Sequence, residues 1–144
     1  FSGRQQNYEK LLAPLDEIDK KRVIDNIIEL ENVIQNFTLD KFLQGAQGAY
    51  NMLIEGFSNH KNDVIDFLVT KDFAKSLQAS PPDSLENNLA ISKVEIADVT
   101  KFGNSAFIKV VFSLQEGCQE EWTFTKNINN QADKAWKISN ITPA

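Results

Sequence analysis

Apolar residues recur at three- and four-residue spacing through the first half of the chain, which is the period of amphipathic α-helices. Residues 1–13 are polar and predict a frayed start. A helix is predicted over residues 14–35, with Pro14 at its first turn and Asn36 as its stop. The first part of the sequence therefore predicts α-helices.

Three further helices are predicted before residue 83. The longest spans residues 38–57 and has an acidic residue in its first turn. Asn62 or Asp63 is the predicted cap of a short helix, and Thr70 starts the next one. Two prolines at positions 81 and 82 then end the helical pattern.

From residue 91 onward the apolar period changes from 3.6 to 2, which indicates β-strands. The first strand is predicted over residues 91–99, with an interruption near Lys93 that a bulge would cause. Gly103-Asn104 and Glu116-Gly117 are turn signals on either side of the second strand. One face of that strand is entirely apolar: Ala106, Ile108, Val110, Phe112 and Leu114.

Two more strands complete the pattern. Trp122 and Phe124 alternate with polar residues in the third strand, and Trp136 and Ile138 begin the fourth. A polar loop is predicted over residues 127–134 between them. Helices followed by hairpin-linked strands predict an α+β domain, with the helices against one face of a four-stranded antiparallel meander.

The helix over residues 38–57 carries glycines beside its apolar face: Gly45, Gly48 and Gly56. A glycine inside a helix costs about 1 kcal/mol relative to alanine. Two explanations stay open: a neighbouring helix packs closely there, or a bound guest borders the glycines. The second explanation predicts a non-catalytic ligand pocket with the following walls: Phe42, Gly45, Gly48, Tyr50, Phe57, Phe112, Trp122 and Phe124.

The length and net charge of the chain indicate how many domains it has and which partners are disfavoured. The chain has 144 residues and a net charge of −5, with acidic and basic residues mixed along its length. This length suits one domain with a single core, and the charge disfavours nucleic acid as a partner. The first residue is Phe1 rather than methionine, so we expect that a targeting or anchoring segment can precede it.

Residues that could perform catalysis or bind a metal are sparse. His60 is the one histidine and lies at a polar helix end, where it is expected to interact with the helix dipole. Asp63 and Asp66 are expected to be a cap and a solvated position, and Cys118 stands alone. We therefore expect no enzyme, no metal site and no cofactor.

Three segments, in order, resemble the Tim forty-four-like domain family, whose mitochondrial member scaffolds the inner-membrane import motor. The segments are the helix from Phe42 to Phe57, the strand Glu121-Trp122-Thr123-Phe124 and the closing strand Ala135-Trp136-Lys137-Ile138. The resemblance covers about residues 37–142 and divides the chain into a segment of residues 1–36 and a domain of residues 37–144.

The resemblance implies a curved sheet, a cone-like fold similar to nuclear transport factor two, and a deep apolar pocket. It also implies a non-catalytic scaffold or adaptor at an inner membrane, bound to lipid, a membrane protein or a chaperone. The acidic composition and the short connection at residues 115–120 favour a bacterial relative over a mitochondrial one. Two alternatives stay open: a carrier of a lipid or small apolar ligand, and a cone-fold isomerase or dehydratase.

The first predicted helix is a candidate membrane or partner helix, as helices before the pocket domain are in the resembling family. It combines three cations with an apolar stripe: Lys20, Lys21, Arg22, Val23, Ile27, Leu30 and Ile34. Interfacial helices bind through buried apolar area and attraction to anionic lipid. The alternative is that the helix simply packs on the domain.

Overall fold

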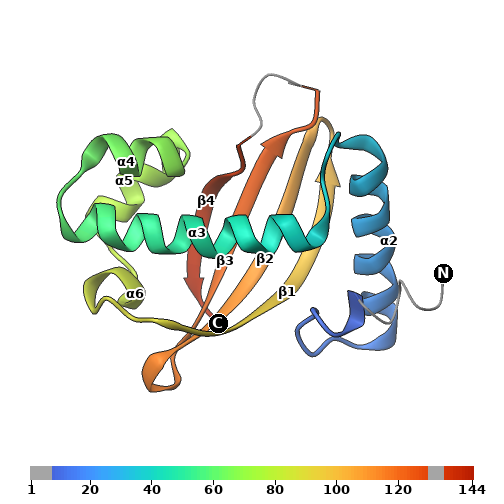
Figure 1. The fold of residues 1–144 in the computed structure, drawn as a ribbon, viewed down its shortest axis with the longest axis horizontal. Coiled ribbons are helices and arrows are strands. Elements are labelled where there is room, and N and C mark those ends of the chain that lie inside the picture. Colours follow the sequence, from blue (N-terminus) through green and yellow to red (C-terminus); the bar gives the residue numbers. More distant parts are fainter. Residues whose placement is uncertain (1–7, 130–134) are drawn as a thin grey trace.

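The computed structural model describes residues 8–129 and 135–144, which form an α+β domain (Figure 1). The helices come first along the chain: α2 (Glu17–Val33), α3 (Leu39–Ser58), α4 (Asn62–Leu68), α5 (Lys71–Ala79) and α6 (Asp83–Glu86). The strands and one 3₁₀ turn follow: β1 (Ile91–Phe102), β2 (Ser105–Leu114), η1 (Gln115–Gly117), β3 (Gln119–Asn127) and β4 (Lys137–Pro143). The predicted fold class is confirmed.

Side-chain caps explain where several helices begin. The Thr38 hydroxyl accepts a hydrogen bond from the Lys41 backbone N–H at 3.3 Å, and Thr70 caps α5 in the same way, both as predicted. Helix α2 begins at Glu17 with Asp16 as its cap, so the predicted start at Pro14 is wrong. The predicted cap of α4 is wrong, because α4 begins at Asn62 and its N-cap residue makes no side-chain hydrogen bond.

The start of the chain is better ordered than the sequence predicts. Leu12 is buried, and residues 11–13 run beside β1. The Ala13 N–H donates to the Ile96 carbonyl at 2.8 Å, and the Ile96 N–H donates to the Leu11 carbonyl at 2.7 Å. These bonds occupy backbone groups at the edge of β1, so the predicted fraying is wrong for residues 8–13.

The sheet is an open antiparallel meander in the order β1-β2-β3-β4. The predicted interruption near Lys93 is confirmed, because the register shifts between Ile91 and Lys93. Gly103 and Gly117 have φ angles of +61° and +76° at the two predicted turns, a backbone conformation that glycine adopts without strain. Of the predicted loop over residues 127–134, residues 130–134 lie outside the described residues.

Helix α3 crosses one face of this sheet, and α2 stands beside β1 at the edge (Figure 1). The apolar row of β2 that the sequence predicts is fully buried under the helices. The predicted division at residue 36 falls in the turn between α2 and α3, and helices on both sides of that turn contribute to the same hydrophobic core. The opposite row of β2 is only half-buried.

Candidate functional site

Helix α3 contributes one ring to each of two groups of aromatic residues on the inner face of the sheet. The first group, which we call the sealed cluster, consists of Tyr50, Phe112 and Trp122. Their ring centroids lie 4.8–5.3 Å apart, and all three side chains are inaccessible to solvent. This is the dense packing of a protein interior, with large rings from α3, β2 and β3 in mutual contact.

Polar atoms of the sealed cluster also find partners inside the protein. The Tyr50 hydroxyl donates to the Leu89 carbonyl at 2.7 Å, and the Trp122 indole N–H donates to Glu120 at 3.0 Å. The other Glu120 oxygen accepts the Ser84 backbone N–H at 3.0 Å, which ties α6 to β3. Burial raises the pKa of the Tyr50 phenol, and the negative charge of Glu120 raises it further.

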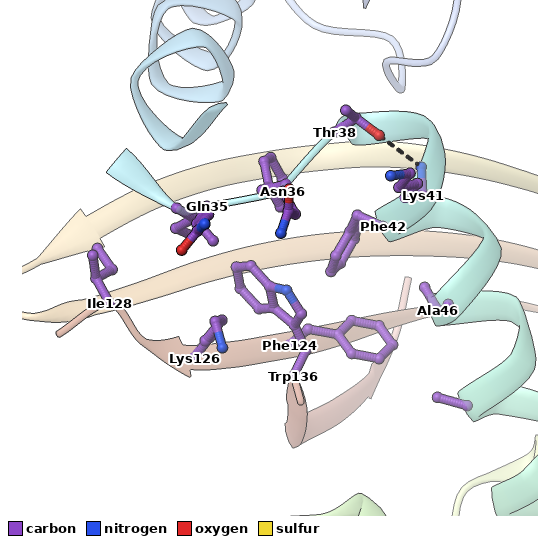
Figure 2. A pocket seen from close by; sticks show the side chains of 14 residues that line it. Gln35, Asn36, Thr38, Lys41, Phe42, Ala46, Phe124, Lys126, Ile128 and Trp136 are labelled. Carbon is purple, nitrogen blue, oxygen red and sulfur yellow. Dashed lines mark hydrogen bonds between the residues drawn. The ribbon is translucent and has the colours of Figure 1, made fainter. Parts of the chain in front are cut away.

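The second aromatic group surrounds a cavity, which we call the hollow, of about 450 Å³ at the other end of α3 (Figure 2). Phe42 is central to it, with ring centroids 5.1 Å from Trp136 and 5.5 Å from Phe124. Phe37 adds a fourth ring, 5.9 Å from Trp136. The lining residues are Ile34, Gln35, Asn36, Phe37, Thr38, Lys41, Phe42, Gly45, Ala46, Ala49, Phe124, Lys126, Ile128 and Trp136.

The sequence of α3 explains why this end is not filled. Between Phe42 and Tyr50, the residues that α3 contributes to the hollow are Gly45, Ala46 and Ala49. Apart from its chain neighbours and the nearby backbone of α3, no heavy atom would lie within 4 Å of a Cβ atom built on Gly45. None of these three residues has a side chain larger than a methyl group, so we attribute the hollow to side-chain size along α3.

The polar side chains at the hollow are two lysines, two amides and the Thr38 hydroxyl. Lys41 is exposed in the first turn of α3, and Lys126 on β3 is only 9% exposed. Gln35 and Asn36 lie in the turn between α2 and α3, where Asn36 has a φ of +62°. Among the described residues that line the hollow there is no aspartate, glutamate, histidine or cysteine.

The structure divides the predicted pocket residues between several places. Phe42, Gly45 and Phe124 line the hollow, whereas Tyr50, Phe112 and Trp122 form the sealed cluster. The half-buried Phe57 lies outside the hollow, and so does the exposed Gly48, which has open space around it. Sequence reasoning missed the remaining lining residues, notably Phe37, Ala46, Lys126 and Trp136.

Of the three predicted helix glycines, Gly56 differs from the other two. A Cβ atom on Gly56 would lie 3.1 Å from Cγ1 of Val64, so α4 approaches the α3 backbone closely there. Gly45 and Gly48 have no such neighbour. Close helix packing, one of the two explanations offered from the sequence, therefore accounts for Gly56 alone.

The apolar stripe of α2 is part of the core. Val23, Ile27, Leu30 and Ile34 are all at most 8% exposed and contribute to the single hydrophobic core. The packing alternative therefore describes α2 in this structure, and the large apolar side chains that α2 leaves exposed are Ile18 and Val33.

The cations on that polar face are engaged in surface ion pairs. Lys20 pairs with Glu17 at 3.4 Å, Lys21 pairs with Asp25 at 3.1 Å, and Arg22 pairs with Asp98 of β1 at 2.8 Å. The bond to Asp98 raises the pKa of Arg22.

The other residues considered for catalysis or metal binding do not lie together in the described part of the chain. His60 is exposed just beyond α3, with a φ of +55°. No group of three or more histidine, cysteine or acidic residues is arranged for a metal ion among the residues described. None of the described helices is both long and apolar enough to cross a bilayer.

Comparison with known proteins finds a relative in an alphaproteobacterium. The chain is 31% identical over 130 residues to the "Uncharacterized protein RP434" of Rickettsia prowazekii (strain Madrid E). The match covers 83% of this chain but 59% of that protein, so the chain spans little more than half of its relative's length. No protein-family model and no solved structure matches the chain.

Proposed function

We propose that this chain is a non-catalytic adaptor domain that holds an apolar segment of a partner protein in the hollow. The observation that carries the proposal is the unfilled space itself, walled by aromatic rings and bounded by the small residues of α3. Protein interiors are normally close-packed, and ligand sites of roughly 300–1,000 Å³ are typically apolar with a few polar groups. The hollow has the size and composition of such a site.

The lining supports the non-catalytic part of the proposal. Histidine and carboxylate side chains, which are the commonest proton-transfer groups in enzymes, are absent from the described lining. The described lining offers lysines, amides and Thr38, whose hydroxyl accepts the Lys41 backbone N–H. This set of groups is suited to binding.

The proposed setting is a bacterial inner membrane, with a membrane protein or a chaperone as the partner. The family resemblance implies this setting, and the Rickettsia relative is consistent with a bacterial protein. Because the apolar stripe of α2 is occupied by the core, membrane association in this proposal comes from the bound partner or from a segment outside this chain.

A second candidate is a carrier of a lipid or another small apolar ligand, with no protein partner. The apolar walls and the volume of about 450 Å³ would suit a single small guest. Organic extraction of the purified protein, followed by mass spectrometry, distinguishes the two functions. A carrier yields an apolar molecule in about equimolar amount, whereas an adaptor yields none.

The adaptor is tested with a variant that fills the hollow. Ala46→Leu places a larger side chain in the cavity, and Asn51→Leu adds the same side chain at an exposed α3 position outside it. In pull-downs from native membranes, we expect a partner that the wild type and Asn51→Leu retain and Ala46→Leu loses. Identical capture by all three folded proteins would contradict the proposal.

A further inference from the structure

Trp136 is a wall of the hollow that lies just before a strand begins. Its ring centroid is 5.1 Å from that of Phe42 and 5.9 Å from that of Phe37 (Figure 2). Strand β4 starts at the next residue, Lys137, which pairs with Thr125 of β3. The position of Trp136 therefore depends on how the first residues of β4 are held.

Trp136 and Lys137 project from opposite faces of the sheet, because successive side chains of a strand alternate. Ile138 pairs with Phe124 of the hollow, so it shares the inner face with Trp136, two residues earlier. Lys137 lies between them and does not line the hollow. Any effect of Lys137 on a guest must therefore pass through its neighbours.

The Lys137 side chain joins the start of β4 to the end of α4. Its Nζ donates a hydrogen bond to the Phe67 carbonyl and lies 4.7 Å from the centroid of the Phe67 ring. Carbonyls in the last turn of a helix lack a partner within the helix, and a lysine can supply one. The face of an aromatic ring also attracts an ammonium group. One residue of α4 thus receives two contacts from Lys137.

The next residue of β4 is held by the same corner between α4 and α5. The Thr70 N–H donates to the Ile138 carbonyl at 2.9 Å, and Val69 forms a parallel bridge with Ile138. Since β3 pairs with the other edge of β4, the start of this strand is held from both sides. The corner at residues 67–70 is therefore attached to two successive residues beside Trp136.

We infer, on the basis of the proposed function, that Lys137 is a positioning residue of the hollow. By attaching the start of β4 to α4, Lys137 holds the Trp136 ring against Phe42 and keeps this wall in place for an apolar guest. Lys137 itself does not touch the guest. Binding in the hollow thus depends on a lysine outside its lining.

Titration of the full chain with decanol tests this role, because a neutral probe has no charge for a lysine to attract. Lys137→Met keeps an apolar stem and removes the ammonium group, whereas Lys137→Arg keeps a cation that can donate to a carbonyl and lie over a ring. A cation–π contact at an exposed site is worth about two- to fivefold in an equilibrium constant. We expect Lys137→Met to bind decanol about threefold more weakly than the wild type, and Lys137→Arg to bind it like the wild type.

Lys109→Met is the matched control. Lys109 is a residue of β2 outside the hollow, where it pairs with Glu121 at 3.7 Å. Its loss removes the same charge from the sheet and should leave the affinity for decanol unchanged. Equal weakening by Lys109→Met and Lys137→Met would overturn the inference.

The indole N–H signals of the two tryptophans show whether the effect passes through Trp136. In the protein without decanol, Lys137→Met should shift the Trp136 signal, because the ring moves relative to Phe42, and leave the Trp122 signal in place. Lys137→Arg should restore the wild-type position. Weaker binding with an unmoved Trp136 signal, or with equal shifts of both signals, would overturn the positioning role.

The remaining outcomes separate this inference from the proposed function. Equal affinity of the wild type and Lys137→Met for decanol overturns the inference and leaves the proposed function intact. Absence of decanol binding to the wild type removes the hollow as an apolar site, and the inference fails together with the proposed function.

Discussion

The sealed cluster and the hollow lie under the same helix and on the same face of the sheet, and they differ mainly in what α3 supplies. At the sealed cluster α3 contributes Tyr50, whose ring packs on both Phe112 and Trp122. At the hollow it contributes Phe42 and, after that ring, the small residues Gly45, Ala46 and Ala49. The difference indicates that a few small residues on one helix can leave a hollow without changing the fold.

The largest expected effect on the free energy of unfolding comes from removing one ring of the sealed cluster or one ring of the hollow. Phe112 and Phe124 are both at most 1% exposed and lie on the same face of the sheet. Changing a buried phenylalanine to alanine costs about 3–5 kcal/mol, with the higher values where the surroundings cannot relax. We expect Phe112→Ala to cost about 5 kcal/mol and Phe124→Ala about 3 kcal/mol in urea unfolding, because Phe124 already borders empty space.

The two substitutions serve as controls for each other, since they delete the same atoms. If Phe124→Ala destabilises the protein as much as Phe112→Ala, the hollow is closed by repacking in solution. The comparison between the two ends would then fail.

A smaller loss of stability is expected at alkaline pH, and Tyr50 of the sealed cluster causes it. The pKa of Tyr50 is raised in the folded protein by burial and by Glu120, whereas the unfolded chain releases this proton near pH 10. Above pH 10 the folded state therefore binds more protons than the unfolded state, and stability falls as pH rises. Tyr50→Phe removes this contribution.

Unfolding free energies at pH 8 and pH 11 provide the measurement. We expect the wild type to lose about 1 kcal/mol more than Tyr50→Phe between these two values, since one pH unit is worth about 1.4 kcal/mol for one proton. Lysine deprotonation affects both proteins alike. Equal losses would indicate that Tyr50 is open to solvent.

The smallest expected change in stability comes from replacing a glycine of α3 with alanine. Gly48 has a helical backbone and open space around it, so Gly48→Ala should stabilise the protein by about 1 kcal/mol. Gly56→Ala should gain less or lose stability, because Val64 lies 3.1 Å from the new Cβ atom. Thermal melts of the two variants decide the point, and equal gains would contradict the close packing of α4 on α3.

Much of the fold could be predicted from the sequence because its signals are local. The alternation in β2, the turns at Gly103 and Gly117, and the caps at Thr38 and Thr70 depend only on neighbouring residues. The order of residues 8–13 could not be predicted, because it depends on hydrogen bonds with the distant strand β1.

The candidate site was harder to predict, because it depends on where α3 crosses the sheet. Phe42 and Tyr50 belong to one helical stripe, but Phe42 packs on Phe124 at the hollow, whereas Tyr50 packs on Trp122 in the sealed cluster. One signal was available: Lys126 continues the alternation of Trp122 and Phe124, which puts a lysine on the inner face. A cation at such a position indicates a polar or open site nearby.

The most direct test of the central claim is an NMR titration that follows the two tryptophan indole N–H signals. The chain has two tryptophans, with Trp136 at the hollow and Trp122 in the sealed cluster. Titration with decanol, a neutral apolar probe, should shift the Trp136 signal and leave the Trp122 signal in place. An unchanged Trp136 signal at saturating decanol, or equal shifts of both signals, would contradict the account.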